Sequence, residues 1–161
     1  YGTIESLTFA FNQETEENLA KFIKECLKKE GIKSKIDKNG HLYFCGYEQM
    51  LKFYLGGMIS LNKEKEKKFL NLCKTAKLQI HLSKKGINDF NNKIIKHNKS
   101  NLNNISEYRY KRMSKIGKMD LNLARDLMSV RDLTNWADYV KVTNNTIKDR
   151  DCVDFIINHL Y

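Results

Sequence analysis

The sequence predicts an α+β fold, in which a strand–helix–hairpin–helix unit is followed by a mainly helical C-terminal module. Leu7, Phe9 and Phe11 alternate with polar or small residues, which is the period-two pattern of a half-buried strand. Asn39 and Gly40 tolerate the positive φ angles of a tight hairpin turn, so two further strands are expected around them. Over residues 121–160 the apolar residues return at helical spacing, which predicts helix throughout that stretch.

The first predicted helix follows the strand at residues 7–11 and carries both a start signal and a stop signal. Thr15 is a capping residue, and Glu16 and Glu17 follow it in the first turn, where the helix dipole favours anions. Gly31 marks the end of the helix. The apolar stripe that we expect to be buried consists of Leu19, Phe22, Ile23, Cys26 and Leu27.

Short strands and helices fill the rest of the first half. Gly56 and Gly57 interrupt the pattern and end one of the helices. The predicted order is strand 32–36, strand 41–45, helix 47–55, helix 63–76 and strand 78–82.

The second half divides into a basic connector and the C-terminal module. Helical spacing covers residues 87–95 and then weakens, and the polar residues 98–105 predict an exposed loop or linker. The expected domains are therefore an α+β domain at residues 1–83, a basic helix and connector at 84–118, and a helical module at 119–161.

The charge of the chain is concentrated in the connector. Among 161 residues, 29 Lys and Arg stand against 19 Asp and Glu, a net charge of +10, which favours a polyanionic partner. Residues 1–83 carry 14 basic and 10 acidic groups, residues 84–118 carry 10 and 2, and residues 119–161 carry 5 and 7. The charge therefore favours a polyanionic partner, and the resemblance described below implies nucleic acid, with duplex DNA favoured.

The cysteines and the hydropathy predict an intracellular protein that does not enter a membrane. The four cysteines form no CxxC pair, which favours free thiols in a reducing compartment. No apolar run approaches the roughly 20 residues that a membrane-spanning helix needs.

Two stretches resemble one half-domain of the LAGLIDADG homing endonucleases. LTFAFNQETEENLAKFIKECLKKEGIKSKI is similar to the strand and helix of that half-domain, and HLYFCGYEQMLKFYLGGMISLNKEKEKKFLNL to its hairpin strand and following helices. The resemblance covers the first half of the chain. It implies a saddle-shaped sheet over DNA, and pairing with a second half-domain or with another copy of the chain.

The catalytic motif of that family is the part that the sequence lacks. The family's motif helix delivers one acidic residue per half to a divalent metal, and the nearest string here, residues 54–62, carries the neutral Asn62 at that place. The catalytic residues are thus unknown and no cofactor is evident. Mg²⁺ is expected only if the chain is part of a nuclease whose catalytic acids lie outside it.

The resemblance also implies which side chains of the first domain face DNA. The face of the sheet opposite the apolar residues presents cations, hydrogen-bonding groups and one aromatic ring, which suit contact with a groove. An ordinary solvated sheet face has the same composition. The candidate residues are Thr8, Lys33, Lys35, His41 and Tyr43.

Residues 133–150 resemble a helix-turn-helix. Ala137 is the small residue where two helices would cross, and Thr143 would cap the recognition helix. Lys141 at the turn and Arg150 at a buried position depart from the pattern, and an ordinary helical hairpin is the alternative. The residues placed towards bases or phosphates are Asn144, Asn145, Thr146 and Lys148.

A third candidate surface is the basic run at residues 108–118, where cations and aromatic residues are interleaved. This mixture suits phosphate contact and stacking, and a solvated charged helix face is the alternative. The candidate residues are Arg109, Tyr110, Lys111, Arg112, Lys115 and Lys118.

Together these features predict a DNA-binding protein that uses a basic sheet face and a basic connector, without cleavage by this chain alone. One alternative is the C-terminal part of a metal-dependent homing endonuclease that cleaves phosphodiesters. A second alternative is a non-catalytic protein-interaction module. The sequence leaves open whether the chain is an enzyme.

Overall fold

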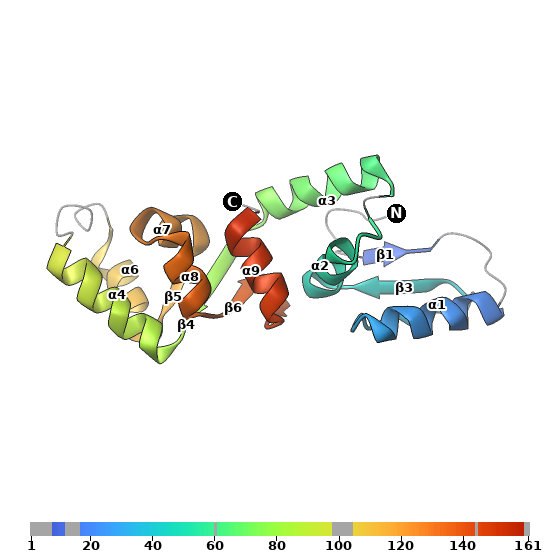
Figure 1. Cartoon of the computed structure of the whole chain (residues 1–161), viewed down its shortest axis with the longest axis horizontal. Coiled ribbons are helices and arrows are strands. Elements are labelled where there is room, and N and C mark those ends of the chain that lie inside the picture. The colour runs from blue at the N-terminus through green and yellow to red at the C-terminus, as the bar shows by residue number, and fades with distance from the viewer. Residues whose placement is uncertain (1–7, 12–16, 60, 98–104, 144, 160–161) are drawn as a thin grey trace. The chain divides into compact units, whose positions relative to one another are not determined.

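The computed structural model describes residues 8–11, 17–59, 61–97, 105–143 and 145–159 (Figure 1). The chain forms two compact units, residues 1–75 and 76–161, each with its own antiparallel sheet. The α+β class expected from the sequence is therefore confirmed. The expected cap Thr15 and residues 98–104 of the expected loop lie outside the described residues.

The boundary between the units lies at Thr75, whereas the sequence placed the end of the first domain at residue 83. Strand β4 (Leu78–Leu82) accounts for the difference, because it pairs with β5 (Lys118–Asp120) and β6 (Ala137–Val142) of the second unit. The same sheet joins residues that the sequence assigned to the connector and to the C-terminal module. Those two segments consequently share one compact unit.

The first unit holds a three-stranded sheet in the order β1 (Thr8–Ala10), β3 (Leu42–Cys45), β2 (Lys35–Ile36). Asp37 organises the hairpin between β2 and β3, because one of its carboxylate oxygens accepts the backbone N–H groups of Asn39 at 2.8 Å and His41 at 2.9 Å. Gly40 has a φ angle of 82°, which a residue with a side chain adopts only with strain. The hairpin turn expected at Asn39 and Gly40 is present.

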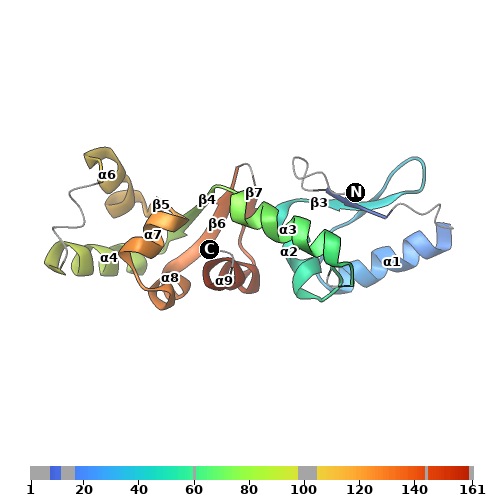
Figure 2. The ribbon, with the colours of Figure 1, turned by 90° about the horizontal axis from the view of Figure 1, so that it is seen from above.

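An aromatic cluster forms the core of the first unit. Phe9 and Phe44 are opposite each other in register, and their ring centroids lie 5.3 Å apart. Phe53 of helix α2 (Tyr47–Leu55) packs against both rings, with centroid distances of 4.9 Å and 5.1 Å. Helices α1 (Glu17–Lys29) and α2 lie on one side of the strands (Figure 2). The opposite side of the sheet carries Thr8, Ala10, Tyr43 and Cys45 together with Lys35 of β2.

Helix α1 buries only part of its predicted stripe. Ala20 and Leu27, seven residues apart, are 1% and 2% exposed, whereas Leu19 is 46% exposed and Phe22 is 66% exposed. The spacing of Leu19, Phe22 and Cys26 places them on a neighbouring stripe of the same helix. The helix is therefore rotated relative to the orientation that its hydrophobic pattern predicts. Helix α3 (Lys63–Thr75) completes the unit.

The second unit holds a four-stranded antiparallel sheet in the order β5, β4, β6, β7 (Asn145–Ile147). One face is apolar: Ile80 of β4 is opposite Met119 on one side and Val140 on the other, and Val140 is opposite Ile147. All four side chains are at most 4% exposed. Helices α8 (Val130–Trp136) and α9 (Arg150–His159) cover this face (Figure 2).

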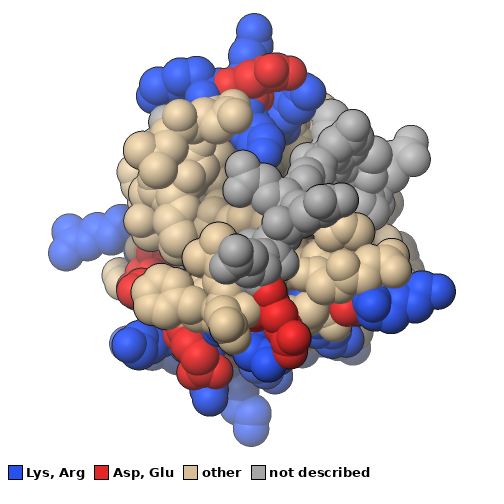
Figure 3. All heavy atoms as spheres, turned by 90° about the vertical axis from the view of Figure 1, so that its right-hand side faces the viewer, with Lys and Arg blue, Asp and Glu red and all other residues tan. Residues whose placement is uncertain are grey.

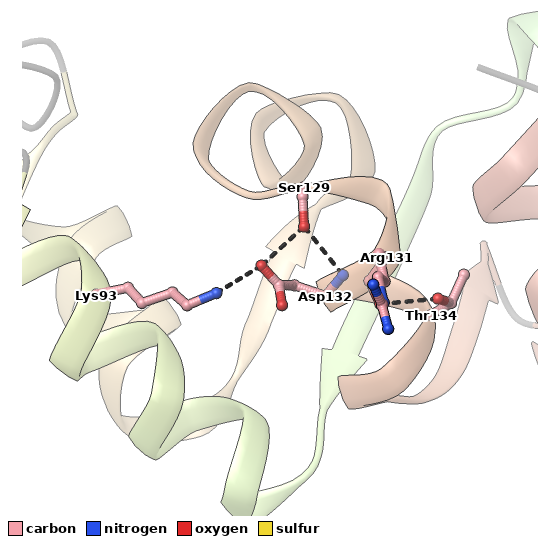
Figure 4. Close-up of polar contacts among 5 residues, drawn as sticks. All are labelled: Lys93, Ser129, Arg131, Asp132 and Thr134. Atoms are coloured by element: carbon pink, nitrogen blue, oxygen red, sulfur yellow. Dashed lines mark hydrogen bonds and ion pairs between the residues drawn. The ribbon is translucent and has the colours of Figure 1, made fainter.

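Three further described helices complete the second unit: α4 (Lys84–His97), α6 (Glu107–Ile116) and α7 (Leu121–Leu127). Figure 4 shows how α4 is joined to α8. Lys93 donates a hydrogen bond to Asp132 at 2.8 Å, and Ser129, the N-cap of α8, donates to the same oxygen at 2.8 Å. Lys93 also lies 5.1 Å from the ring centroid of Trp136, a cation–π distance. This ion pair ties the two helices together.

The expected helix-turn-helix is wrong, and so is the expectation that residues 121–160 are helical throughout. Strands β6 (Ala137–Val142) and β7 (Asn145–Ile147) pair with each other, and Val140, Val142 and Ile147 are buried in them. β-branched residues that alternate with polar ones favour a strand, and they override the helical spacing on which the prediction depended. Thr143, the expected cap of a recognition helix, instead lies between the two strands with a φ angle of 49°.

Candidate nucleic-acid interface

The face of the second sheet that points away from α8 and α9 is polar and accessible. Strand alternation places Gln79 in register with Lys141 and Asp120, and His81 in register with Tyr139 and Lys118. Residues directly opposite each other in antiparallel strands point to the same side of the sheet. We call this side the outer face, and its residues are Gln79, His81, Lys118, Asp120, Tyr139, Lys141 and Thr146.

Helix α6 leads directly into the edge strand of this sheet. Ser106 caps its first turn by accepting the backbone N–H of Arg109, and Gly117 ends it in the left-handed conformation, with a φ angle of 71°. Strand β5 then begins at the next residue, Lys118. A Cβ atom at residue 117 would lie 3.1 Å from the backbone oxygen of Leu82, and the positive φ angle adds strain for any other residue, so this junction favours glycine. The cations of α6 are thereby held close to the outer face.

Three of the predicted cations line one pocket of about 140 Å³ at this edge of the sheet. Arg109 and Arg112 are three residues apart and so lie on the same side of α6, and Lys118 comes from β5. No ion pair joins any of the three to a described acidic side chain. The other lining residues of this cationic pocket are Gln79, Met113, Met119, Asp120 and Leu123.

Asp120 is the acidic member of the cationic pocket, and its carboxylate has a structural role. One of its oxygens accepts the backbone N–H groups of Asn122 at 3.0 Å and Leu123 at 3.4 Å, which caps helix α7. The pocket therefore holds three positive charges against one negative charge that is already hydrogen-bonded. Such a site attracts an anion, and the planar guanidinium groups match the paired oxygens of a phosphate.

A pair of stacked rings lies on the outer face beside the cationic pocket. The rings of His81 and Tyr139 are 4.7 Å apart at an interplanar angle of 14°. A bulge in the pairing of β4 with β6 brings Asp138 near the pair, with its Oδ2 3.4 Å from Nδ1 of His81. His81 is the residue opposite Lys118, so one strand spacing separates the rings from the cationic pocket. The sequence prediction did not include this pair.

The remaining α6 residues of the predicted basic run are distributed around the helix. Lys111 and Lys115 are exposed and Tyr110 is half-buried, and none of them lines the cationic pocket. Of the six candidates, Arg109, Arg112 and Lys118 are therefore the ones that the structure brings together around one pocket.

Residues predicted for the recognition helix reach the surface on a strand. Thr146 lies in β7 opposite Lys141 and so belongs to the outer face, while Asn145 lies opposite Val142. Lys148 is exposed after the end of β7, and Asn144 lies outside the described residues. Among the three described residues of this group, Thr146 joins the outer face, and it does so from a strand instead of the predicted helix.

The candidates of the first unit separate into two groups. Thr8, Lys35 and Tyr43 lie on the side of the sheet opposite the aromatic cluster, since Lys35 is opposite Tyr43 and Thr8 alternates with Phe9. Lys33 precedes β2, and its backbone N–H donates to Gln49 at 2.7 Å. With Lys24 and Lys28, Lys33 lines a separate pocket of about 400 Å³.

His41 lies at the end of the hairpin, where it interacts with Asp37. Its Nδ1 is 3.1 Å from a carboxylate oxygen of Asp37, and its backbone N–H is the main cause of the lowered pKa of that carboxyl group. Figure 3 shows that lysine and arginine side chains stand around the rim of the face it displays, with acidic side chains between them. Helix α1 carries ion pairs as well, such as Lys21 with Glu17 at 2.6 Å.

Comparison with family models, curated proteins and solved structures found no match for this chain. Within the described residues, no three His, Cys, Asp or Glu side chains are grouped so that they could hold a metal ion. No helix in that part of the chain is long and apolar enough to cross a membrane.

The nearest string to the LAGLIDADG motif does not form one helix. Helix α2 ends at Leu55, and Gly56 and Gly57 follow it in turns. Asn62, at the place of the family's acidic residue, precedes α3, and its side-chain oxygen accepts the backbone N–H of Lys65 at 3.1 Å. This amide therefore has a capping role at the start of α3.

Proposed function

We propose that this protein binds nucleic acid, and that the cationic pocket of the second unit contacts the phosphate backbone. The observation that supports this proposal is the meeting of Arg109, Arg112 and Lys118, from a helix and a strand, around one accessible pocket. Phosphate contacts supply most of the affinity in non-specific nucleic-acid binding, and Arg and Lys side chains make them. Duplex DNA, the partner expected from the sequence, carries this backbone.

The surroundings of the pocket suit an anion better than a divalent metal. Mg²⁺ sites in proteins are built from carboxylates that keep free oxygens for the ion. Asp120 is the acidic side chain of the pocket, and it already accepts two backbone N–H groups while three cations surround it. The described residues around the pocket, one carboxylate among three cations, therefore do not fit a Mg²⁺ site.

The test is the salt dependence of duplex binding by the full chain and by the triple variant Arg109→Gln, Arg112→Gln, Lys118→Gln. Each phosphate contact contributes about 0.9 to the slope of log K against log salt. The triple variant should therefore bind more weakly at low salt, with a slope smaller by about 2.7. Fluorescence anisotropy of a labelled duplex gives both quantities.

The matched control removes the same charge elsewhere in the second unit. Lys84, Lys85 and Arg131 are exposed and line none of the pockets described above. Their triple substitution with Gln should keep a slope close to that of the unaltered chain. Equal decreases in affinity and in slope for the two triple variants would contradict a phosphate site at the cationic pocket.

Two further outcomes bear on the alternatives. Absence of binding to both duplex and single-stranded nucleic acid at low salt would contradict the proposal and favour the protein-interaction module. Mg²⁺-dependent nicking of a supercoiled plasmid by the full chain would instead favour the endonuclease alternative.

A further inference from the structure

We infer that the outer face of the second unit receives an unpaired base on the His81–Tyr139 ring pair, and that the protein therefore prefers single-stranded nucleic acid to duplex. This inference rests on the proposed function, because it takes the cationic pocket to be the phosphate site. It adds a chemical class of ligand, a strand with unstacked bases, to a site that by itself would accept any nucleic-acid backbone.

The two rings of the pair are accessible from the outer face. His81 and Tyr139 come from the two central strands β4 and β6, on the side of the sheet that carries no packed core residues. The side chain of His81 is 25% exposed, and Tyr139 is also half-buried rather than enclosed. Among the described aromatic residues, no third ring stacks on the pair. A planar base can therefore extend the existing stack.

The ring pair lies beside the cations of the cationic pocket. Lys118 lies opposite His81 on the adjacent strand, and Lys118 also lines the cationic pocket with Arg109 and Arg112. A stacking surface and a phosphate site thus lie one strand spacing apart. That combination of a basic groove and exposed aromatic rings is the general solution for binding single strands.

The bases of an intact duplex cannot stack on the ring pair. In a duplex each base is stacked between its neighbours and paired across the helix, so its flat faces cannot contact a protein ring unless it leaves the stack. An unpaired base has a free face and free hydrogen-bonding edges. Around the ring pair, Gln79, Thr146 and the carboxylate of Asp138 offer donors and acceptors to such edges. The ring pair therefore adds affinity for single strands that duplex binding lacks.

The experiment compares binding of the full chain to an oligothymidylate of about 12 nucleotides, a length within the site sizes of single-strand-binding domains, and to a duplex of the same length. We expect tighter binding of the single strand. The variant Tyr139→Leu keeps an apolar side chain on the strand but removes the ring. It should weaken single-strand binding by about 5- to 150-fold and leave duplex binding close to that of the unaltered chain.

The variant Tyr139→Phe is the matched control, because it keeps the ring and removes only the hydroxyl group. It should bind the single strand as tightly as the unaltered chain does. A second readout is the emission of 2-aminopurine placed at a central position of the strand. Its quenching on binding should persist in Tyr139→Phe and disappear in Tyr139→Leu. Circular dichroism and thermal unfolding identify a variant that fails to fold, in which case His81→Leu takes its place.

The outcomes separate this inference from the proposed function. If neither nucleic acid binds in a salt-dependent way, the proposed function itself fails. If both bind through the cationic pocket but the duplex binds as tightly as the single strand, or Tyr139→Leu weakens both equally, only the stacking inference is overturned.

Discussion

A single carboxylate joins two helices of the second unit. Asp132 accepts hydrogen bonds from Lys93 of α4 and from Ser129 at the start of its own helix (Figure 4). The hydrogen bond from Lys93 is the main cause of the lowered pKa of Asp132, and the bond from Ser129 acts in the same direction. The charged form of this carboxyl group is thus favoured by folding.

The pH dependence follows from that lowered pKa. A carboxyl group with a folded-state pKa below its ordinary value of 3.8 stabilises the fold at pH values above 3.8. This contribution is lost as the pH falls through the folded-state pKa. The variant Asp132→Asn should be less stable than the unaltered chain at pH 7, and the difference should shrink towards pH 3.

Urea unfolding at a series of pH values measures this difference. Asp126 is exposed on the neighbouring helix α7 and serves as the control position. Asp126→Asn should change the free energy of unfolding little at either pH. If the free energies of unfolding of Asp132→Asn and of the unaltered chain differ by the same amount at every pH, the ionised Asp132 carboxylate is not the source of the stabilisation.

At the scale of elements, the predictions agree with the structure where a segment fits only one local pattern, either that of a helix or that of a turn. The helix predicted at residues 47–55 has those bounds, and the hairpin turn at Asn39 and Gly40 is present. The β6–β7 hairpin was missed because Val140, Val142 and Ile147 fit a helical stripe as well as a strand. Pairing with β4 decides in favour of the strand. Val140 pairs with Ile80, about sixty residues earlier in the chain, and the local spacing of apolar residues carries no information about such a distant partner.

The packing of α4 against α8 gives a second prediction at this scale. Gly86 lies in the first turn of α4, and a Cβ atom there would lie 2.6 Å from Cβ of Trp136. Alanine normally stabilises a helix relative to glycine by about 1 kcal/mol. Here the overlap with Trp136 should outweigh that gain, and Gly86→Ala should destabilise the unit by about 1–3 kcal/mol.

Chemical unfolding monitored by circular dichroism measures this change. The control is Asn92→Ala, at an exposed position of the same helix, where the propensity gain acts without an overlap. It should leave stability unchanged or slightly raised. A stabilising Gly86→Ala would show that α4 can shift away from Trp136 without loss.

At the scale of the whole molecule, the sequence predicted the basic charge of the candidate interface. It did not predict which residues from different strands meet there. The basic excess of residues 84–118 and the interleaving of cations with aromatic residues at 108–118 indicated Arg109, Arg112 and Lys118. Their grouping with Gln79 and with the His81–Tyr139 pair depends on the strand order β5, β4, β6, which no local pattern contains. The residues expected on the first sheet lie in the other compact unit.

Because each unit has its own sheet and its own core, we expect them to unfold separately. Phe53, 4% exposed, belongs to the aromatic cluster of the first unit, and the single tryptophan, Trp136, lies in the second. Phe53→Ala should cost about 3–5 kcal/mol in the first unit. The urea midpoint measured by Trp136 fluorescence should stay unchanged, while part of the circular dichroism transition moves to lower urea.

Leu133→Ala is the matched control, because Leu133 is fully buried beside Trp136 on α8. This variant should move the fluorescence midpoint. A shift of the fluorescence midpoint in Phe53→Ala as well would show that the two units unfold as one.

The glycine at the junction of α6 and β5 has a consequence for binding kinetics. With Gly117 in the left-handed conformation and no loop after it, Arg109 and Arg112 keep their positions relative to Lys118 before any ligand arrives. A preorganised set of donors loses little conformational entropy when it binds. Such a set affects chiefly how long a complex lasts, since affinity differences at one interface arise mostly in the dissociation rate. Loosening this junction should therefore shorten the lifetime of the complex more than it slows its formation.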